Sequence, residues 1–268
     1  MAIHKLSSAV PFRNGQLQNE TMALTQKLLD FFLPAKCLSC DSEPSVICRN
    51  CLSSLLTDPL DVTRAQPQLG LHQICGTAVV DYSPQAAKLI SAFKEQQLFS
   101  LAKPMAELMV AALLKSNFVA EWQDNNSVPI VLVPIPSTST SKLKRGFVPA
   151  QLLAQACAQL LRKHDAFKSA RISVAAGLVV SDRADQAKLD RGSRFEVSRN
   201  SMKFYGSISQ ASLVLLIDDL ITTGASIFEA RRAISHTLSA ELLSLVNFTF
   251  LTFAETSLKL VTRNEKKV

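Results

Sequence analysis

The sequence lacks the features of a secreted or membrane-embedded protein. Within its 268 residues, no apolar run approaches the ~20 residues that a membrane-spanning helix needs. The first residues, MAIHKLSSAVPFRNGQLQNE, contain no apolar core of the kind found in a signal peptide. We therefore expect a cytoplasmic protein without a membrane span.

Histidine and aromatic residues are also scarce. The four histidines are scattered along the chain, so they indicate no histidine-based site. Aromatic residues make up 6% of the sequence, and none interleaves with the charges of the basic segment KLKRGF at 142–147. This scarcity argues against a platform on which the bases of a nucleic acid could stack.

The composition indicates a globular protein that suits anionic ligands. Apolar residues make up 47% of the chain and charged residues 19%. A chain of 268 residues can hold one domain of ordinary size and a smaller module. The net charge of +7 favours a partner such as a pyrophosphate or the backbone of a nucleic acid. Charge alone does not choose between them.

The most informative stretch is LVLLIDDLITTGAS, residues 213–226. Its five leading apolar residues predict a strand buried in the middle of a parallel sheet. Asp218 and Asp219 follow, and two adjacent carboxylates are expected where the strand leaves the sheet at its carboxyl edge. The small or hydroxyl-bearing residues that precede the next helix-like segment are Thr222, Thr223, Gly224, Ala225 and Ser226. Amide groups at a helix N-terminus, with hydroxyls beside them, can hold a phosphate.

The two acids restrict the ligand further, because they would repel a bare phosphate. Ribose hydroxyls and Mg²⁺ can both bind carboxylates: hydroxyl-to-carboxylate bonds are charge-assisted, and Mg²⁺ prefers oxygen ligands. The pattern therefore predicts a ribose 5-phosphate. The alternative is an ordinary strand–turn–helix junction in which the Asp and Thr side chains cap the helix.

This order of residues resembles the phosphoribosyl-pyrophosphate (PRPP) loop of the type I phosphoribosyltransferases. The resemblance implies an α/β fold in which helices flank a parallel sheet, and the alternation of strand and helix patterns along the chain agrees with it. It also implies transfer of a phosphoribosyl group to a nucleophile, with release of pyrophosphate. Asp218 and Asp219 would hold the ribose hydroxyls, directly or through Mg²⁺, and residues 222–226 would hold the 5-phosphate.

Four cysteines form a paired motif nearer the start of the chain. Cys37, Cys40, Cys48 and Cys51 follow the pattern C-x2-C, seven residues, C-x2-C. In a chain without an export signal this spacing predicts a Zn²⁺ site, because two such turns can complete a tetrahedron of thiolates. Four protein ligands leave no open position, so the site is expected to be structural. The alternatives are a redox dithiol and unrelated buried thiols.

The four-cysteine module also resembles that of the ComF family, a branch of the phosphoribosyltransferases. The resemblance continues in a later segment that contains Tyr82, Leu89, Ile90 and Lys94. It implies that Lys94 lies on the side of the pocket. The alternative is that Lys94 is a lysine at a helix end that is solvated or that interacts with the helix dipole.

A second candidate for anion binding follows the predicted strand PIVLV. In type I phosphoribosyltransferases the loop after an early strand holds the pyrophosphate, and the resemblance assigns three residues to it, Pro136, Ser137 and Thr138. Three cations follow on what we expect to be a mobile loop, Lys142, Lys144 and Arg145. They suit the neutralisation of a leaving pyrophosphate. The alternatives are a solvated basic loop and a nucleic-acid contact.

The chain matches the ComF pattern in segment 181–197 but departs from it at three positions, one in this segment and two at 148–149. Gln186 and Arg194 match the ComF pattern, which implies that they lie beside the pocket, although the segment also reads as an ordinary charged surface. The family version follows Arg-Gly-Phe with Asn-Gln, whereas Val148 and Pro149 stand here. It has Asn where this chain has Val197. The contacts of these amide side chains are therefore missing.

The sequence divides into five segments. We expect a disordered tail at 1–20, a lead helix and zinc module at 21–57, and a linker at 58–73. A phosphoribosyltransferase-like domain follows at 74–258, with a basic tail at 259–268. The tails are predicted from their polar composition, and the linker from Pro59, Pro67 and Gly70.

Three functions are compatible with these patterns. The first is a ComF-like phosphoribosyltransferase that binds Mg²⁺ and PRPP and acts on an acceptor that the sequence does not identify. The second, which the ComF resemblance also implies, is a non-catalytic accessory of natural transformation that engages single-stranded DNA or a competence helicase. The third is a PRPP sensor without turnover.

Overall fold

The computed structural model describes residues 36–42, 45–55, 58–66, 71–116, 128–180, 201–208, 210 and 212–256. Within these ranges, no helix has both the length and the apolar character required to cross a membrane. The tails predicted at 1–20 and 259–268 and the lead helix predicted from residue 21 lie outside the described residues, as do Gln186, Arg194 and Val197.

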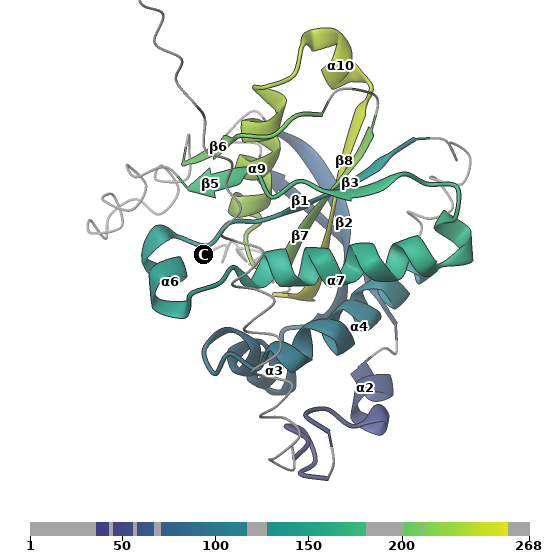
Figure 1. Cartoon of the computed structure of the whole chain (residues 1–268), viewed down its shortest axis with the longest axis vertical. Helices are drawn as coiled ribbons and strands as arrows, with labels where there is room; N and C mark the ends of the chain where they lie inside the picture. The colour runs from purple at the N-terminus through teal and green to yellow at the C-terminus, as the bar shows by residue number, and fades with distance from the viewer. Residues whose placement is uncertain are drawn as a thin grey trace, which may run out of the picture.

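A mostly parallel sheet of six strands forms the centre of the protein (Figure 1). In the order β1-β2-β8-β7-β3-β4, the strands are β1 (Leu60–Gln66), β2 (Leu71–Asp81), β8 (Val246–Glu255), β7 (Ser212–Ile221), β3 (Ile130–Pro134) and β4 (Ile172–Val174). β1 runs antiparallel to β2, and every other pair of neighbours is parallel. The predicted α/β class with a parallel sheet is confirmed.

Helices cover both faces of this sheet (Figure 1). The helices are α2 (Arg49–Leu55), α3 (Pro84–Lys94), α4 (Ala102–Lys115), α6 (Ser139–Arg145), α7 (Pro149–Lys163), α9 (Ala225–Ser235) and α10 (Ala240–Ser244). α3, α4 and α7 pack on one face, and α9 packs on the other. A separate antiparallel ribbon of β5 (Leu178–Val180) and β6 (Met202–Phe204) joins the core on the α9 side.

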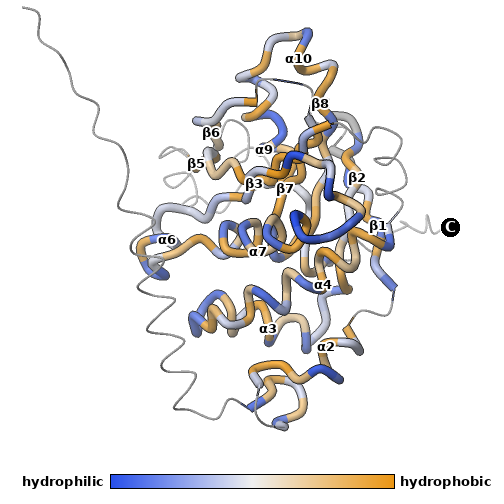
Figure 2. Tube along the Cα trace, turned by 45° about the vertical axis from the view of Figure 1, so that its right-hand side comes forward, coloured by the Kyte–Doolittle hydropathy of each residue, from blue (hydrophilic) through white to orange (hydrophobic). Residues whose placement is uncertain are grey.

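The sequence of β7 accounts for its central position. Leu213, Leu215 and Ile217 belong to the core beneath α4 and α7, while Val214 and Leu216 belong to the core beneath α9. Successive side chains of a strand point to opposite faces, so an unbroken apolar run suits a strand covered on both sides. The central strands are hydrophobic over most of their length (Figure 2). Burial of each such side chain stabilises the fold by about 1.5–3 kcal/mol.

Two segments differ from the sequence-based expectation. The linker predicted at 58–73 contains β1 and the start of β2. Leu60 and Val62 turn inward while Asp61 and Thr63 are exposed, which is the two-residue alternation of a strand. The proline and glycine residues around this short pattern obscured it.

The basic segment predicted to be a mobile loop contains a helix instead. In α6, Thr138 is the N-cap and its hydroxyl oxygen accepts a hydrogen bond from the Ser141 amide at 3.3 Å. Gly146 ends the helix in the left-handed conformation with φ of 74°. A capping residue at each end explains why a segment with so few apolar residues is helical.

Candidate functional site

The order in which successive strands are added to the sheet reverses between β7 and β3. The connection from β3 runs through α7 to β4, on one side of the pair, and the connection from β7 runs through α9 to β8, on the other. In an open α/β sheet, ligands bind outside the carboxyl ends of the strands at such a switch point. A ligand site is therefore expected at the loops that follow β7 and β3.

A small pocket opens beside the loop that follows β7. Its volume is about 50 Å³, and its lining consists of Asp218, Leu220, Ile221, Thr222, Thr223, Gly224, Ala225, Ser226 and Ile227. The side chains of Thr222, Thr223 and Ser226 are exposed. The structure thus gathers one acid and all five predicted phosphate-binding residues around one opening.

The start of α9 supplies amide groups to this pocket. Gly224, the N-cap, has φ of 81°, a left-handed conformation that favours glycine. The Phe228 amide donates to the Gly224 carbonyl at 3.0 Å, so the amides of residues 225–227 precede the regular hydrogen bonding of the helix. The Ala225 amide also lies 3.3 Å from the hydroxyl of Thr223. Amides at this end of a helix attract anions.

The two adjacent acids were predicted where the strand leaves the sheet, but β7 continues past them to Ile221 along β8, and only its pairing with β3 ends at Ile217. The two acids have different surroundings. Asp218 lines the pocket and is half-buried, and its carboxylate accepts a hydrogen bond from the Asp219 amide at 2.9 Å. Asp219 is 2% exposed, and its Oδ2 lies 2.8 Å from the Nζ of Lys94. The sequence predicts that both acids hold a ribose, but only Asp218 of the pair lines the described pocket.

Burial raises the pKa of Asp218 well above its ordinary range, and the neighbouring carboxylate of Asp219 raises it further. The Lys94 ammonium opposes this shift. A bound cation or several hydroxyl donors would favour the ionised form of Asp218. The electrostatics of the pocket thus suit a ligand that brings positive charge or hydroxyl groups to this acid.

The predicted pyrophosphate loop lies beside the end of β7. The Ile135 amide donates to the Ile217 carbonyl at 2.9 Å, which continues the pairing of β3 with β7. The three loop residues that follow, Pro136, Ser137 and Thr138, are half-buried. This loop therefore lies next to the end of β7, the neighbouring strand, which carries Asp218.

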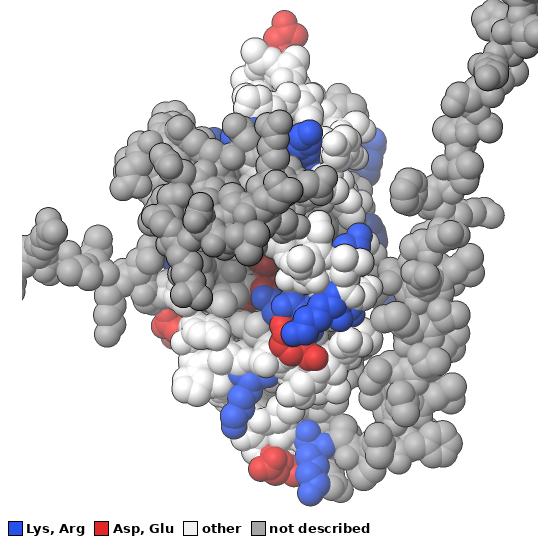
Figure 3. All heavy atoms as spheres, turned by 90° about the vertical axis from the view of Figure 1, so that its left-hand side faces the viewer, with Lys and Arg blue, Asp and Glu red and all other residues white. Residues whose placement is uncertain are grey.

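The three predicted cations lie on α6. Lys142 and Lys144 are exposed, whereas Arg145 Nη2 lies 2.5 Å from Glu95 Oε1. The hydrogen bond from Arg145 lowers the pKa of Glu95. On the face drawn in Figure 3, basic side chains gather next to acidic ones at the centre of the view. Part of the predicted positive charge is thus already paired within the chain.

An aromatic cluster anchors the end of α6. The ring of Phe147 packs edge-on against Phe99, with centroids 4.8 Å apart, and against Phe93 at 6.1 Å. Phe93 belongs to α3, next to Lys94 and Glu95. The C-terminal end of α3 therefore contacts Asp219 through Lys94 and the end of α6 through Phe93 and Glu95. These contacts join the two loops of the site. Lys94, which was predicted to lie beside the pocket, pairs with Asp219 and is not among the residues that line the pocket.

The sequence reasoning missed Arg64. It lies in the segment predicted to be a linker, yet it is 7% exposed and its Nε donates to the Thr222 carbonyl at 3.0 Å. Its guanidinium also pairs with the buried Glu255. The alternation of inward Leu60 and Val62 was the available signal, because it places Arg64 on the same inward side.

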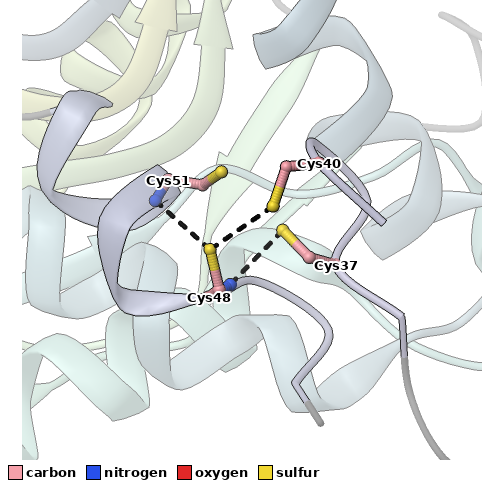
Figure 4. Close-up of side chains that lie close together, drawn as sticks. All are labelled: Cys37, Cys40, Cys48 and Cys51. Atoms are coloured by element: carbon pink, nitrogen blue, oxygen red, sulfur yellow. Dashed lines mark hydrogen bonds between the residues drawn. The ribbon is translucent and has the colours of Figure 1, made fainter. Parts of the chain in front are cut away.

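The four cysteines form a compact cluster at the edge of the α3 and α4 layer (Figures 1 and 4). Their sulfur atoms all lie within 4.8 Å of one another, and Cys40 and Cys48 are 3.6 Å apart. Tetrahedral Zn²⁺ with Zn–S bonds of about 2.3 Å separates its sulfur ligands by roughly 3.8 Å. The backbone amide of Cys51 lowers the pKa of the Cys48 thiol to about 6, which favours the thiolate form that binds metals. The cluster can therefore hold a metal such as zinc.

The cysteine cluster is attached to the main core. Leu55 of α2 is buried in that core, and Leu38, Ile47 and Leu52 pack against it. The Gln85 amide group at the start of α3 donates to the Ser39 hydroxyl at 2.6 Å. A metal that orders the cluster would thus also support the surface of α3 and α4.

Comparison with known proteins adds no family assignment. No protein-family model matches the chain, and no curated protein matches it at a significant level.

Proposed function

We propose that this chain binds Mg²⁺ and PRPP at the carboxyl ends of β7 and β3 and transfers the phosphoribosyl group to an acceptor. The observation that carries the proposal is the pocket that combines Asp218 with the hydroxyls and amides of residues 222–227. Neither the acid nor the set of hydroxyls and amides specifies PRPP alone. Together they match its two ends, because the ribose offers hydroxyls and the 5-phosphate offers negative charge.

In this proposal each side of the site has its own task. Residues 222–226 hold the 5-phosphate, and Asp218 accepts hydrogen bonds from the ribose hydroxyls. The loop at 136–138 faces the pyrophosphate, with the cations of α6 beside it. Mg²⁺ would neutralise part of the negative charge on the pyrophosphate.

The reaction replaces one bond at the anomeric carbon with another. The bond from C1 of the ribose to the pyrophosphate oxygen breaks, and a bond from C1 to the nucleophilic atom of the acceptor forms. The pyrophosphate leaves with the bonding electron pair, and the acceptor loses its proton to solvent. Because positive charge develops on the ribose in the transition state, the ionised carboxylate of Asp218 would stabilise it in this proposal.

We further propose that the fold is a type I phosphoribosyltransferase-like fold of the ComF kind.

We also propose that Zn²⁺ is the metal of the four-cysteine module. The four thiolate ligands of this module and their paired spacing support a structural role for the metal. Native mass spectrometry of the purified chain tests this assignment. One Zn²⁺ per chain is the expected result, and loss of the metal in a Cys48→Ser variant is the control. A chain purified without metal that also fails to take up added Zn²⁺ would contradict the assignment.

The DNA-binding alternative has weaker support. Within the described residues, Arg145 is engaged by Glu95, and acidic side chains lie next to basic ones at the centre of the view in Figure 3. A nucleic-acid backbone favours a groove that is positive along its length. We therefore keep PRPP as the proposed ligand.

One experiment tests the proposal directly. The purified chain is incubated with Mg²⁺, PRPP and a panel of nucleobases and amines, and the release of pyrophosphate is measured. Release that depends on one acceptor supports a transferase. Binding of PRPP without release with any acceptor would contradict the transferase and support the non-catalytic accessory or the sensor, and no binding in the presence of Mg²⁺ would contradict the whole proposal.

A further inference from the structure

Arg64 is a buried arginine that contacts the loop after β7 from a distant part of the chain. It belongs to β1 and precedes Thr222 by 158 positions. Its 7% exposure requires that the guanidinium find partners inside the protein. These partners all lie at the carboxyl ends of β7 and β8 or on β1 itself.

The guanidinium makes four hydrogen bonds. Nε donates to the Thr222 carbonyl at 3.0 Å, and Nη1 donates to the Thr63 carbonyl at 3.2 Å. Nη2 donates to the Glu255 carboxylate and, at 3.1 Å, to the Thr256 carbonyl. A planar guanidinium holds its donors in a fixed fork. Arg64 therefore fixes the Thr222 carbonyl relative to the end of β8.

The aliphatic stem of the same side chain contacts Gly224. A Cβ atom added to Gly224 would lie 3.1 Å from the Cγ of Arg64 and 3.2 Å from its Cβ. The space above this glycine is thus occupied by the arginine stem. Arg64 contacts the loop at two points, the Thr222 carbonyl and the N-cap of α9.

We propose that Arg64 is a positioning residue for the anion-binding loop. By fixing residues 222 and 224, it directs the first amides of α9 toward the pocket. Arg64 acts through the loop, since the pocket lining consists of residues 218 and 220–227. The identity of the anion rests on the proposed function, whereas the position of the loop can be measured without a ligand.

Arg64→Lys tests this role because lysine keeps the charge but loses the fork. Hydrogen exchange of the segment 222–231, in which the Phe228 amide closes the first helical hydrogen bond on the Gly224 carbonyl, is measured by mass spectrometry without ligand. The exchange of its hydrogen-bonded amides is expected to accelerate about tenfold, as is typical when a charge-assisted hydrogen bond is lost. Mg-PRPP affinity should fall by about the same factor. Glu255→Gln, which preserves the arginine, should give a smaller change in the same direction.

Arg162→Lys is the matched control. Arg162 also uses its fork on a backbone carbonyl, that of Ile172, at 3.2 and 3.0 Å, but at the far end of α7. It should leave both loop exchange and PRPP affinity unchanged. Exchange that stays at the wild-type rate in Arg64→Lys, or that accelerates equally in every peptide, overturns the proposal. If wild type does not bind Mg-PRPP but Arg64→Lys selectively accelerates loop exchange, the positioning role stands and the proposed function fails.

Discussion

The loops that follow β7 and β3 lie at neighbouring strand ends but present different chemical groups. After β7, the groups that face the pocket are backbone amides and hydroxyls on a loop held by a buried arginine. After β3, the charged groups are lysine and arginine side chains on a short helix, and two of the three cations are exposed. The first loop is defined by its backbone conformation, and the second by its side-chain charge.

This difference predicts how each loop responds to mutation and to salt. A backbone cradle is lost when the conformation of the loop changes, and single side-chain truncations affect it little. Exposed cations contribute through charge, so their effect is modest and is screened by salt. The variants below separate the two modes, beginning with the largest expected effect.

Gly224→Ala should weaken Mg-PRPP binding most. The left-handed conformation with φ of 81° is unfavourable for alanine, and the added Cβ would meet the stem of Arg64 at 3.1 Å. Strain of about 1–3 kcal/mol at such a position corresponds to roughly a 5–150-fold loss of affinity if the loop relaxes to relieve it. Isothermal titration calorimetry measures the affinity.

Gly146→Ala is the matched control for this variant. Gly146 has φ of 74° but no atom within 4 Å of the added Cβ. It should lose similar stability from backbone strain, with a much smaller loss of affinity. Equal losses of affinity in the two variants would remove the distinction between the loops.

Asp218→Asn should lower Mg-PRPP affinity about tenfold, as expected for the loss of charge-assisted hydrogen bonds. Asp165→Asn, at an exposed carboxylate just beyond the C-terminal end of α7, should have no effect. Unchanged affinity in Asp218→Asn would count against this carboxylate as the ribose contact.

The same variant has a predicted effect on stability without ligand. Because the folded-state pKa of Asp218 is raised, the folded protein binds more protons than the unfolded chain above about pH 4, the ordinary carboxyl range. The free energy of unfolding of wild type should therefore fall as the pH rises from there toward neutrality. Asp218→Asn should flatten this dependence and raise the melting temperature at neutral pH. A steeper dependence in the variant would contradict the assignment.

Glu95→Gln should give the smallest effect, in the opposite direction. It releases Arg145 from its exposed ion pair, which is worth about 0–1 kcal/mol, so affinity for Mg-PRPP should increase by at most about fivefold. The gain should shrink at high salt. Glu107→Gln changes the net charge equally and also breaks a surface pair, with Lys103 on α4, but should give no gain. Weaker binding in Glu95→Gln would show that the pair supports the site instead of competing with the ligand.

Much of the fold and part of the site could be predicted from local patterns. The apolar run before Asp218, the glycine at 224 and the cysteine spacing each depend on residues close together in sequence. β1 and α6 were missed because their signals are short: one is an alternation of four residues between prolines, and the other a helix defined by its two caps. The same alternation places Arg64 on the inward side of β1, but it does not predict the partners of Arg64, because Thr222 and Glu255 lie 158 and 191 positions further along the chain.

The sequence by itself determined that an acid pair, a glycine turn and a helix N-terminus come in this order after one buried apolar run, and that four cysteines share one small module. Local spacing is enough for this, because each feature lies within one short stretch of consecutive residues. Only the tertiary structure decided which acid lines the pocket, that Lys94 pairs with the other, and that Arg64 holds the loop. These depend on the order of strands in the sheet, which brings residues more than a hundred positions apart into hydrogen-bonding distance.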